Sequence, residues 1–409
     1  MRDRAQRAIA ECKLIAEFTE EPGRTTRRFL TPPVRDVHAF LRGRMEALGM
    51  TVHIDAVGNL RGLWQPAGAA TRKRLILGSH IDTVPNAGSY DGVLGVVLAL
   101  ESVQIAQEIA FPMPIEVIAF SEEEGVRYGV PFLGSRAVAG TFDMGLLAYE
   151  DADGVRMDDA IRAFGLDPGK IGGAAIDPTE VYGFVEMHIE QGPVLEAENL
   201  QLAVVEAIVG QTRMELRFTG QANHAGTTPM HLRRDALAAA AEWMTEVERT
   251  AHSTTGLVAT VGKIAAEPGA ANVIPGRVKL SLDIRHESDR IRSASVKELM
   301  DRAGAIAARR KLQFDAKETM NQAAVPMDPN LTSRLLEVVE AAGFEPKRMP
   351  SGAGHDAMVM AARVPTAMLF LRSPGGISHH PNEAVREEGV EAALVVGRAF
   401  LARLGSEVG

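Results

Sequence analysis

Short apolar runs alternate with helix-like segments in the first half of the chain, and this alternation constrains the fold more than any other feature. Leu75 to Leu77, Ile115 to Phe120 and Phe184 to Ile189 are each typical of a buried strand, because apolar residues dominate successive positions. The small, apolar segment from Gly92 to Val103 is typical of a buried helix. Strands that alternate with helices predict an α/β fold, with a mostly parallel sheet and helices on both of its faces.

Other segments show the same kind of pattern. Residues 34–48 carry apolar side chains at helical spacing, and residues 52–63 predict two short strands. Near the C-terminus, residues 331–342 predict a helix and residues 366–370 a strand. Because the α/β pattern returns after an interruption, we expect the first domain to be discontinuous.

A different pattern begins near Glu206. Residues 214–218 alternate strictly between apolar and polar, as in a sheet with one covered face. The segments that follow predict a helix at 235–250, strands at 257–261 and 278–284, a helix at about 293–310 and a strand at 313–317. This β-α-β-β-α-β order predicts a ferredoxin-like α+β domain. We therefore expect residues 209–322 to be inserted into a domain made of residues 1–208 and 323–409.

Composition excludes several classes of partner. The chain has 44 basic and 53 acidic residues, a formal net charge of −9, which argues against broad nucleic-acid binding. Cys12 is the single cysteine, so no internal disulfide is possible, which fits a reducing compartment. The N-terminal segment mixes both charge signs without an apolar stretch, and no run approaches a membrane span. We therefore expect a cytoplasmic protein without membrane or nucleic-acid partners.

A histidine and an aspartate follow the first buried strand. His80 and Asp82 are two residues apart, so on extended backbone their side chains point the same way. Asp82 is then placed to accept a hydrogen bond from the imidazole and fix its tautomer. Taken alone, the pair fits an exposed histidine and a turn aspartate better than a metal site.

Acidic and imidazole side chains follow the other predicted strands as well. Asp91 precedes the buried helix, where an N-cap is the simpler role. Residues 122–124 are three successive glutamates, which repel one another unless a cation or solvent separates them. His188 ends the third strand, and His379 lies near the C-terminus. In open α/β sheets, sites form beyond the carboxyl ends of the strands, so these segments together predict a metal site.

Taken together, these residues resemble the metallopeptidase-like amidohydrolases. That group includes carboxypeptidase G-type peptidases, allantoate amidohydrolases and N-carbamoyl-L-amino-acid hydrolases. The resemblance covers nearly the whole chain, from the His80 segment to residues 375–379. Residues 188–193 and 223–230 are similar to the carbamoylase and allantoate amidohydrolase branch. The peptidase branch usually has an acidic residue where His188 stands.

The resemblance implies two divalent metal ions per subunit. It assigns five ligands: Asp91 between the ions, His80 and His188 on one ion, and Glu124 and His379 on the other. Glu123 is then the general base, with Asp82 supporting the catalytic site. Imidazole and carboxylate ligands suit zinc, manganese, cobalt or nickel, and the residues do not select among them. His380 follows His379 where the family usually has serine or asparagine, so it remains an alternative ligand.

The resemblance also implies residues that hold the substrate. It assigns five positions: Gln191 on the ureido group, His224 on the scissile carbonyl, Asn272 and Arg285 on the carboxylate, and Gly354 for close backbone approach. An arginine fork suits a carboxylate because it can donate two parallel hydrogen bonds. Without the resemblance, Arg285 is equally an exposed strand cation and His224 a plain loop histidine. Residues 351–357 superficially match a dinucleotide fingerprint but lack its third glycine.

The predicted function is hydrolysis of the ureido or N-carbamoyl amide bond of a small carboxylic acid by metal-activated water. Allantoate and an N-carbamoyl-L-amino acid are both candidate substrates. A dipeptidase or aminoacylase using the same metals is the closest alternative. A non-catalytic binding protein is a third, but it predicts loss of Glu123 or of a ligand, and all are present. The resemblance further implies a homodimer formed through the inserted domain, which acts as a lid.

Overall fold

The computed structural model describes residues 1–408, which form two compact units. One unit contains Met1–Glu206 and the chain from Met327 onward, and the other contains Ala207–Pro326. The inserted unit thus begins two residues before, and ends four residues after, the segment 209–322 expected from the sequence. None of the described helices combines the length and apolar character needed to cross a membrane.

A mixed sheet of nine strands, in the order β1-β2-β4-β3-β5-β16-β6-β14 with β15 beside β6, lies mainly in the first unit, whereas β14 and the last two residues of β6 belong to the second. Its strands are β1 (Thr51–Ile54), β2 (Leu60–Trp64), β3 (Arg74–His80), β4 (Ile115–Phe120), β5 (Val181–Ile189), β6 (Leu202–Ile208), β14 (Val325–Pro326), β15 (Arg348–Ser351) and β16 (Thr366–Leu371). The central strands β4, β3, β5 and β16 are parallel, whereas β2 and β6 join them antiparallel. The predicted α/β class is confirmed, with antiparallel strands added at both edges.

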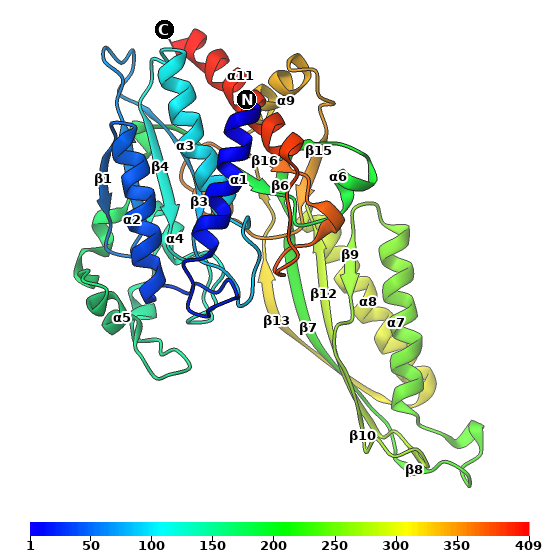
Figure 1. Ribbon diagram of the computed structural model, residues 1–409. Helices are drawn as coiled ribbons and strands as arrows, with labels where there is room; N and C mark the ends of the chain where they lie inside the picture. Colours follow the sequence, from blue (N-terminus) through cyan, green and yellow to red (C-terminus); the bar gives the residue numbers. More distant parts are fainter. Residues whose placement is uncertain (409) are drawn as a thin grey trace. The chain divides into compact units, whose positions relative to one another are not determined.

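Helices pack around this sheet (Figure 1). They are α1 (Arg2–Ala16), α2 (Pro32–Ala47), α3 (Val93–Glu108), α4 (Leu133–Ala139), α5 (Met157–Ala163), α6 (Val194–Ala197), α9 (Pro329–Ala341), α10 (Asp356–Met360) and α11 (Glu387–Val408). The helix α3 lies against β3, β4 and β5 and also contacts α1 and α11. It is apolar on every side and buried almost throughout, as its sequence predicts. Its first turn follows Asp91, so the packing of α3 sets the position of that carboxylate.

A single buried carboxylate ties three of these helices together. Glu101, in α3, is fully buried and faces three guanidinium groups. Its Oε2 lies 2.9 Å from Arg4 Nη1 and 3.3 Å from Arg7 Nη2, both in α1, and its Oε1 lies 3.2 Å from Arg44 Nη2 in α2. The arginines keep partial access to water, whereas the carboxylate has none.

Glu101→Ala is therefore expected to lower the free energy of unfolding by about 1.5–3 kcal/mol, the usual contribution of hydrogen bonds to a charged group, because three partly exposed guanidinium groups lose their shared acceptor. Urea unfolding monitored by circular dichroism measures the change. Glu46→Ala is the matched control, since Glu46 forms an exposed pair with Arg42 at 3.7 Å. Exposed pairs contribute roughly 0.2–1 kcal/mol. Equal losses in the two variants would show that the buried network adds no more stability than an exposed pair.

The second unit has the predicted ferredoxin-like arrangement. Its strands β7 (Gly210–Thr219), β9 (Val258–Thr260), β10 (Ile264–Glu267), β12 (Arg277–His286) and β13 (Gln313–Gln322) alternate with α7 (Ala236–Ser253) and α8 (Asp289–Arg310). The order β10-β12-β7-β13, with β9 beside β12, is antiparallel throughout. The alternate residues Met214, Leu216 and Phe218 are buried in one core with Trp243 of α7 and Leu299 of α8. A separate two-stranded antiparallel sheet of β8 (Asn223–His224) and β11 (Val273–Ile274) completes the unit.

Candidate metal centre

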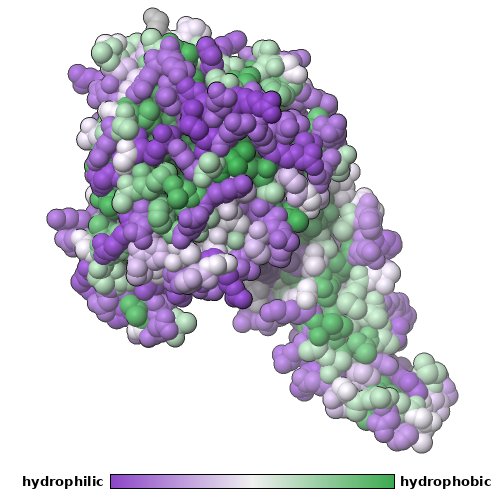
Figure 2. Space-filling model, viewed as in Figure 1, coloured by the Kyte–Doolittle hydropathy of each residue, from purple (hydrophilic) through white to green (hydrophobic). Residues whose placement is uncertain are grey.

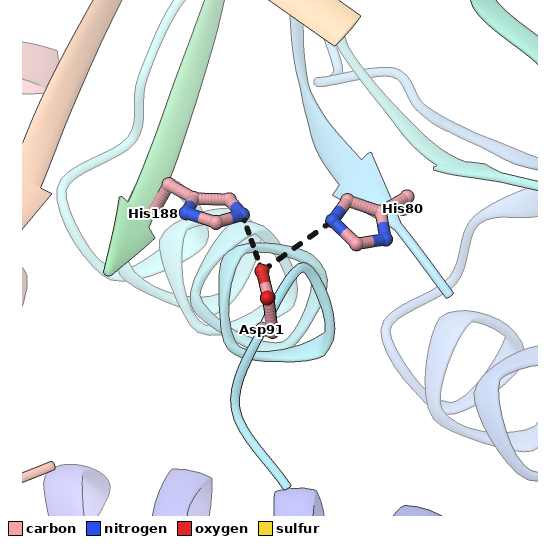
Figure 3. A group of neighbouring side chains, drawn as sticks. All are labelled: His80, Asp91 and His188. Carbon is pink, nitrogen blue, oxygen red and sulfur yellow. Dashed lines mark ion pairs between the residues drawn. The ribbon is translucent and has the colours of Figure 1, made fainter. Parts of the chain in front are cut away.

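The five predicted ligands lie together in the first unit. They come from different elements: His80 from the end of β3, His188 from β5, Asp91 from the turn before α3, Glu124 from the turn after β4 and His379 from the loop after β16. Four groups of potential ligand atoms each have their atoms within 4.8 Å of one another, and two of them are His80, Asp91 and His188, and Asp91, Glu124 and His379. Asp91 belongs to both. Figure 3 shows the first group, with both imidazoles turned toward the Asp91 carboxylate.

The two oxygens of Asp91 face different histidines. Oδ1 lies 3.1 Å from His188 Nε2 and 3.7 Å from His80 Nε2, whereas Oδ2 lies 3.2 Å from His379 Nε2. The buried Oδ1 accepts no hydrogen bond among the described residues. An unpaired carboxylate oxygen is costly to bury, and a cation between it and the imidazoles removes that cost. These donors therefore fit a divalent cation.

Both inner histidines have their tautomers set by neighbouring acceptors. His188 Nδ1 lies 2.8 Å from the carbonyl oxygen of Ile189. His80 Nδ1 lies 3.1 Å from the backbone oxygen of Asp82 and 3.3 Å from its Oδ1. A proton on each Nδ1 leaves the Nε2 lone pair directed at Asp91, the form in which imidazole binds a metal.

Asp82 also supports the glutamates after β4. Its Oδ1 accepts the N–H of Glu123 at 2.9 Å, and its Oδ2 accepts the N–H of Glu124 at 3.0 Å. Burial, and then the nearby Glu124 and Asp356 carboxylates, raise the pKa of Glu123 well above its usual value, although His80 opposes this. Burial, followed by Asp91, raises the pKa of Glu124 to about 7. One aspartate thus links His80 to both glutamates.

Three residues around Asp91 contribute contacts that the sequence analysis did not assign. Gln191, predicted on the substrate, here donates to Asp91 Oδ2 at 2.9 Å. Ser378 Oγ donates to the same oxygen at 2.9 Å, and Glu383 accepts the backbone N–H of Asp91 at 3.0 Å. Ser378 and Glu383 lie in the same segment as His379, and this proximity in the sequence could have indicated that they contribute to the site. Gln191 (φ 59°) and His379 (φ 56°) have left-handed backbone conformations, strain of the kind that gathers at functional sites.

Two further ionisable residues, His355 and Glu186, lie beside His188. The buried His355 ring packs edge-on against the His188 ring, with 4.4 Å between the ring centroids. Glu186, His188 and His355 form a further group of potential ligand atoms. Burial, and then the neighbouring His188, lower the pKa of His355 well below its usual value. Glu186 is two residues before His188 on β5, so it shares a face of the sheet with it. The sequence analysis assigned no chemistry to His355.

The structure also bears on the choice between His379 and His380 and on the reason for glycine at position 354. His379 Nε2 lies 3.4 Å from Glu124 Oε1, whereas His380 Nδ1 accepts the N–H of Asn382 at 3.1 Å. A Cβ at Gly354 would lie 2.8 Å from the Phe132 ring. Close packing against Phe132 is therefore a reason for glycine there that needs no ligand.

The predicted substrate residues of the inserted unit fall into two places. His224 pairs with Val273 in the two-stranded sheet, and the carbonyl of Asn272 accepts the N–H of Ala225 at 2.9 Å. Arg285 instead pairs with Gln211 at the opposite end of β12. At the usual rise of a strand, Arg285 lies roughly 27 Å from Arg277, the first residue of β12. The structure brings His224 and Asn272 together and separates both from Arg285.

Comparison with known proteins agrees with this geometry. The profile described as peptidase family M20/M25/M40 matches residues 76–406. The chain belongs to this family. Its members use divalent metal ions, in keeping with the ligand groups around Asp91.

Relatives place the M20 chain in the hydantoinase/carbamoylase branch. It is 36% identical to the allantoate deiminase of Arabidopsis thaliana, over 98% of this chain and 82% of that protein. It is 36% identical to the N-carbamoyl-L-amino-acid amidohydrolase of Paenarthrobacter aurescens, over 97% and 98% of the two chains. A solved hydantoinase/carbamoylase family amidase from Burkholderia multivorans superimposes with a TM-score of 0.90 at 32% identity, covering 98% of this chain and 97% of that one. The chain is thus a hydrolase of the carbamoylase and allantoate amidohydrolase type.

Proposed function

We propose that this M20 chain hydrolyses the ureido or N-carbamoyl amide bond of a small carboxylic acid, with two divalent metal ions and Glu123 as general base. The observation that carries the proposal is the environment of Asp91. One of its oxygens faces His80 and His188, and the other faces His379, which also lies beside Glu124. The relatives named above act on allantoate or N-carbamoyl-L-amino acids, both of which contain such a bond and a carboxylate.

Glu123 is proposed to carry out the proton transfer of the reaction. Bound divalent ions would polarise the scissile carbonyl and lower the pKa of a nearby water. Glu123 is held at the end of β4 by Asp82 and adjoins the ligand Glu124. From there its carboxylate accepts the proton of the attacking water and returns it to the leaving nitrogen. Burial of Glu123, at 8% exposure, keeps this transfer away from bulk solvent.

His224 is prepared to donate a hydrogen bond. Its Nδ1 accepts the N–H of Gly226 at 3.1 Å, so the proton of the neutral ring stands on Nε2. The loop is held in place by Arg233, which donates to the carbonyls of Thr228 and Ala225. An exposed Nε2–H on a fixed loop suits a substrate carbonyl oxygen.

The separation of His224 from Arg285 supports a shared site. Because roughly 27 Å of strand lies between them, one small substrate cannot contact both in a single chain. The proposal therefore takes His224 and Asn272 from a second copy. The edge strand β9 offers a place for that copy to bind, since α7 and β9 line a groove of about 560 Å³ with both polar and apolar walls, the latter including Met244, Val247 and Val258. Figure 2 shows hydrophobic side chains gathered along α7 and the strands beside it.

Mixing two inactive variants tests this shared site. Glu123→Gln and His224→Ala homodimers are each expected to be inactive, but a heterodimer should regain one working site of two. The site that keeps Glu123 borrows an intact His224 from the other chain. Activity is measured after subunit exchange, which a mass-labelled partner verifies. Persistent inactivity after proven exchange would reject the shared site and leave the metal centre unaffected.

Arg285 is proposed to bind the substrate carboxylate. Asp283 contacts its guanidinium group, with Nε 2.9 Å from Oδ1 and Nη2 3.1 Å from Oδ2. This pair orients the guanidinium plane, and the substrate carboxylate would bind at the same group.

Arg285→Ala is expected to reduce kcat/KM for acids roughly ten- to hundredfold, because a charge-assisted hydrogen bond contributes about 1.5–3 kcal/mol. The matching amides or esters should be hardly affected. Steady-state kinetics on each acid and its amide measure the difference. Arg213→Ala is the control, since Arg213 also pairs with Asp283 but has no proposed substrate role. An equal loss on charged and uncharged substrates would indicate a folding role for Arg285.

The reaction itself is tested by offering allantoate, N-carbamoyl-L-amino acids and dipeptides side by side in manganese-supplemented buffer. Ammonia release is measured for the first two and free amino acids for the third. We expect turnover of a ureido or carbamoyl acid. Cleavage of dipeptides alone would instead support the dipeptidase alternative.

A further inference from the structure

One buried carboxylate beside the metal centre belongs neither to the proposed ligands nor to the proposed base. Glu383 is 6% exposed and lies in the segment that carries His379. Its Oε1 accepts the backbone N–H of Tyr90 at 2.8 Å and that of Asp91 at 3.0 Å. Two consecutive peptide groups in the turn before α3 are therefore held by one oxygen from a segment almost three hundred positions later in the chain.

The other oxygen of Glu383 reaches the Asp91 side chain through a serine. Ser378 Oγ lies 3.3 Å from Glu383 Oε2 and 2.9 Å from Asp91 Oδ2. Ser378 immediately precedes His379, whose Nε2 faces that same Asp91 oxygen at 3.2 Å. Glu383 thus contacts the backbone of Asp91 directly and its carboxylate indirectly.

The surrounding backbone is shaped to admit this carboxylate. A Cβ at Gly88 would lie 2.4 Å from Glu383 Cβ and 2.5 Å from its Oε1. Any side chain at position 88 would displace Glu383 from the turn. Asp82 makes a parallel arrangement, since its two oxygens accept the consecutive N–H groups of Glu123 and Glu124. The turns that carry Asp91 and Glu124 are therefore each held by a carboxylate from elsewhere in the fold.

We propose that Glu383 is a positioning residue that holds the Asp91 turn and the Ser378–His379 segment in one geometry, so that their side chains can share a metal ion. This inference rests on the metal centre of the proposed function. The physical reason is that Asp91 and His379 lie on separate loops, and His379 has a strained backbone with φ 56°. Without a cross-link between the loops, each would relax separately and the ligand atoms would move apart.

The test measures manganese affinity of the full-length, metal-depleted chain by titration calorimetry, with bound metal counted by elemental analysis. Glu383→Met keeps the size of the side chain but removes both acceptors. It is expected to weaken manganese binding roughly 10–100-fold, the usual cost of losing a residue that supports a metal ligand. Glu383→Gln should bind close to the wild type. Its amide oxygen still accepts both N–H groups, and its NH₂ can donate to Ser378 Oγ while Ser378 donates to Asp91.

Two further variants keep the result interpretable. Gly88→Ala leaves every acidic group in place but pushes Glu383 out of its pocket, so it should weaken manganese binding as Glu383→Met does. It decides the question if Glu383→Met fails to fold, as judged by circular dichroism. Asp235→Leu is the control, because Asp235 also accepts two backbone N–H groups, those of Leu237 and Ala238, but lies in the inserted unit and not in the unit that contains the ligands. It should bind manganese as the wild type does.

The outcomes separate this inference from the proposed function. Wild-type manganese affinity in folded Glu383→Met or Gly88→Ala would overturn the positioning role. So would equal weakening by Glu383→Gln and Glu383→Met, because the amide preserves the acceptor geometry. A wild-type chain that binds no manganese, cobalt or zinc at all would instead reject the metal centre itself.

Discussion

Removing divalent metal should abolish turnover, and adding back manganese, cobalt, nickel or zinc should restore it. The reason is the Asp91 environment, where a buried carboxylate oxygen without a hydrogen bond faces two imidazoles. The measurement is activity after chelation and dialysis, followed by titration with each ion. Magnesium and calcium provide the contrast, because these hard cations favour all-oxygen ligand sets and should restore little.

The stoichiometry of this restoration carries further information. Two ligand groups share Asp91, so we expect two ions per chain at full activity. His379→Ala removes a ligand from one group alone and should leave the His80, Asp91 and His188 group able to bind. Full activity in rigorously metal-free protein would contradict the mechanism as a whole.

Glu123→Gln should lower kcat by roughly 10²–10⁴-fold, the usual contribution of a general acid–base group, while metal content stays near that of the wild type. Its carboxylate is buried at the end of β4, and its backbone N–H is held by Asp82. The amide preserves size and this backbone contact but cannot accept the proton of water. Steady-state kinetics and elemental analysis on the same preparation measure both quantities.

Glu124→Gln is the matched comparison, since Asp82 holds its N–H in the same way. Glu124 lies 3.4 Å from His379 in the second ligand group, so its substitution should reduce bound metal as well as activity. If Glu123→Gln lost metal and Glu124→Gln kept it, the two roles would be exchanged.

Much of the fold is visible in residue patterns that act over short distances. The strand at Ile115–Phe120 begins and ends where the sequence predicts, and the apolar segment after Asp91 forms the buried helix α3. The alternation at residues 214–218 marks a strand with one covered face, and Met214, Leu216 and Phe218 do fill one core. These predictions hold because side-chain burial repeats with the period of the element itself. The helices α1 and α11 were not predicted, although α11 is long and half of it is buried.

Some features of the site could likewise be predicted from local sequence patterns, and others could not. His80, Asp91, Glu123, Glu124 and His188 stand next to predicted strands or helices, so their neighbourhood followed from topology. By contrast, nothing local in the sequence shows that Gln191 and Ser378 both donate to Asp91, or that Gly354 packs on Phe132. Those contacts join loops whose paths depend on the packing of the whole first unit.

The sequence by itself determined the fold class, the family resemblance and the identity of the donor groups, because these depend on residue types and on periodicity within single elements. Only the tertiary structure decided which donors face Asp91, that Glu383 reaches across to hold its turn, and that His224 lies far from Arg285 along β12. The physical reason is that hydrogen bonds and ligand contacts require atoms to approach within about 3–4 Å. Spacing along a chain does not specify such approaches between distant segments, whereas the packing of the folded chain does.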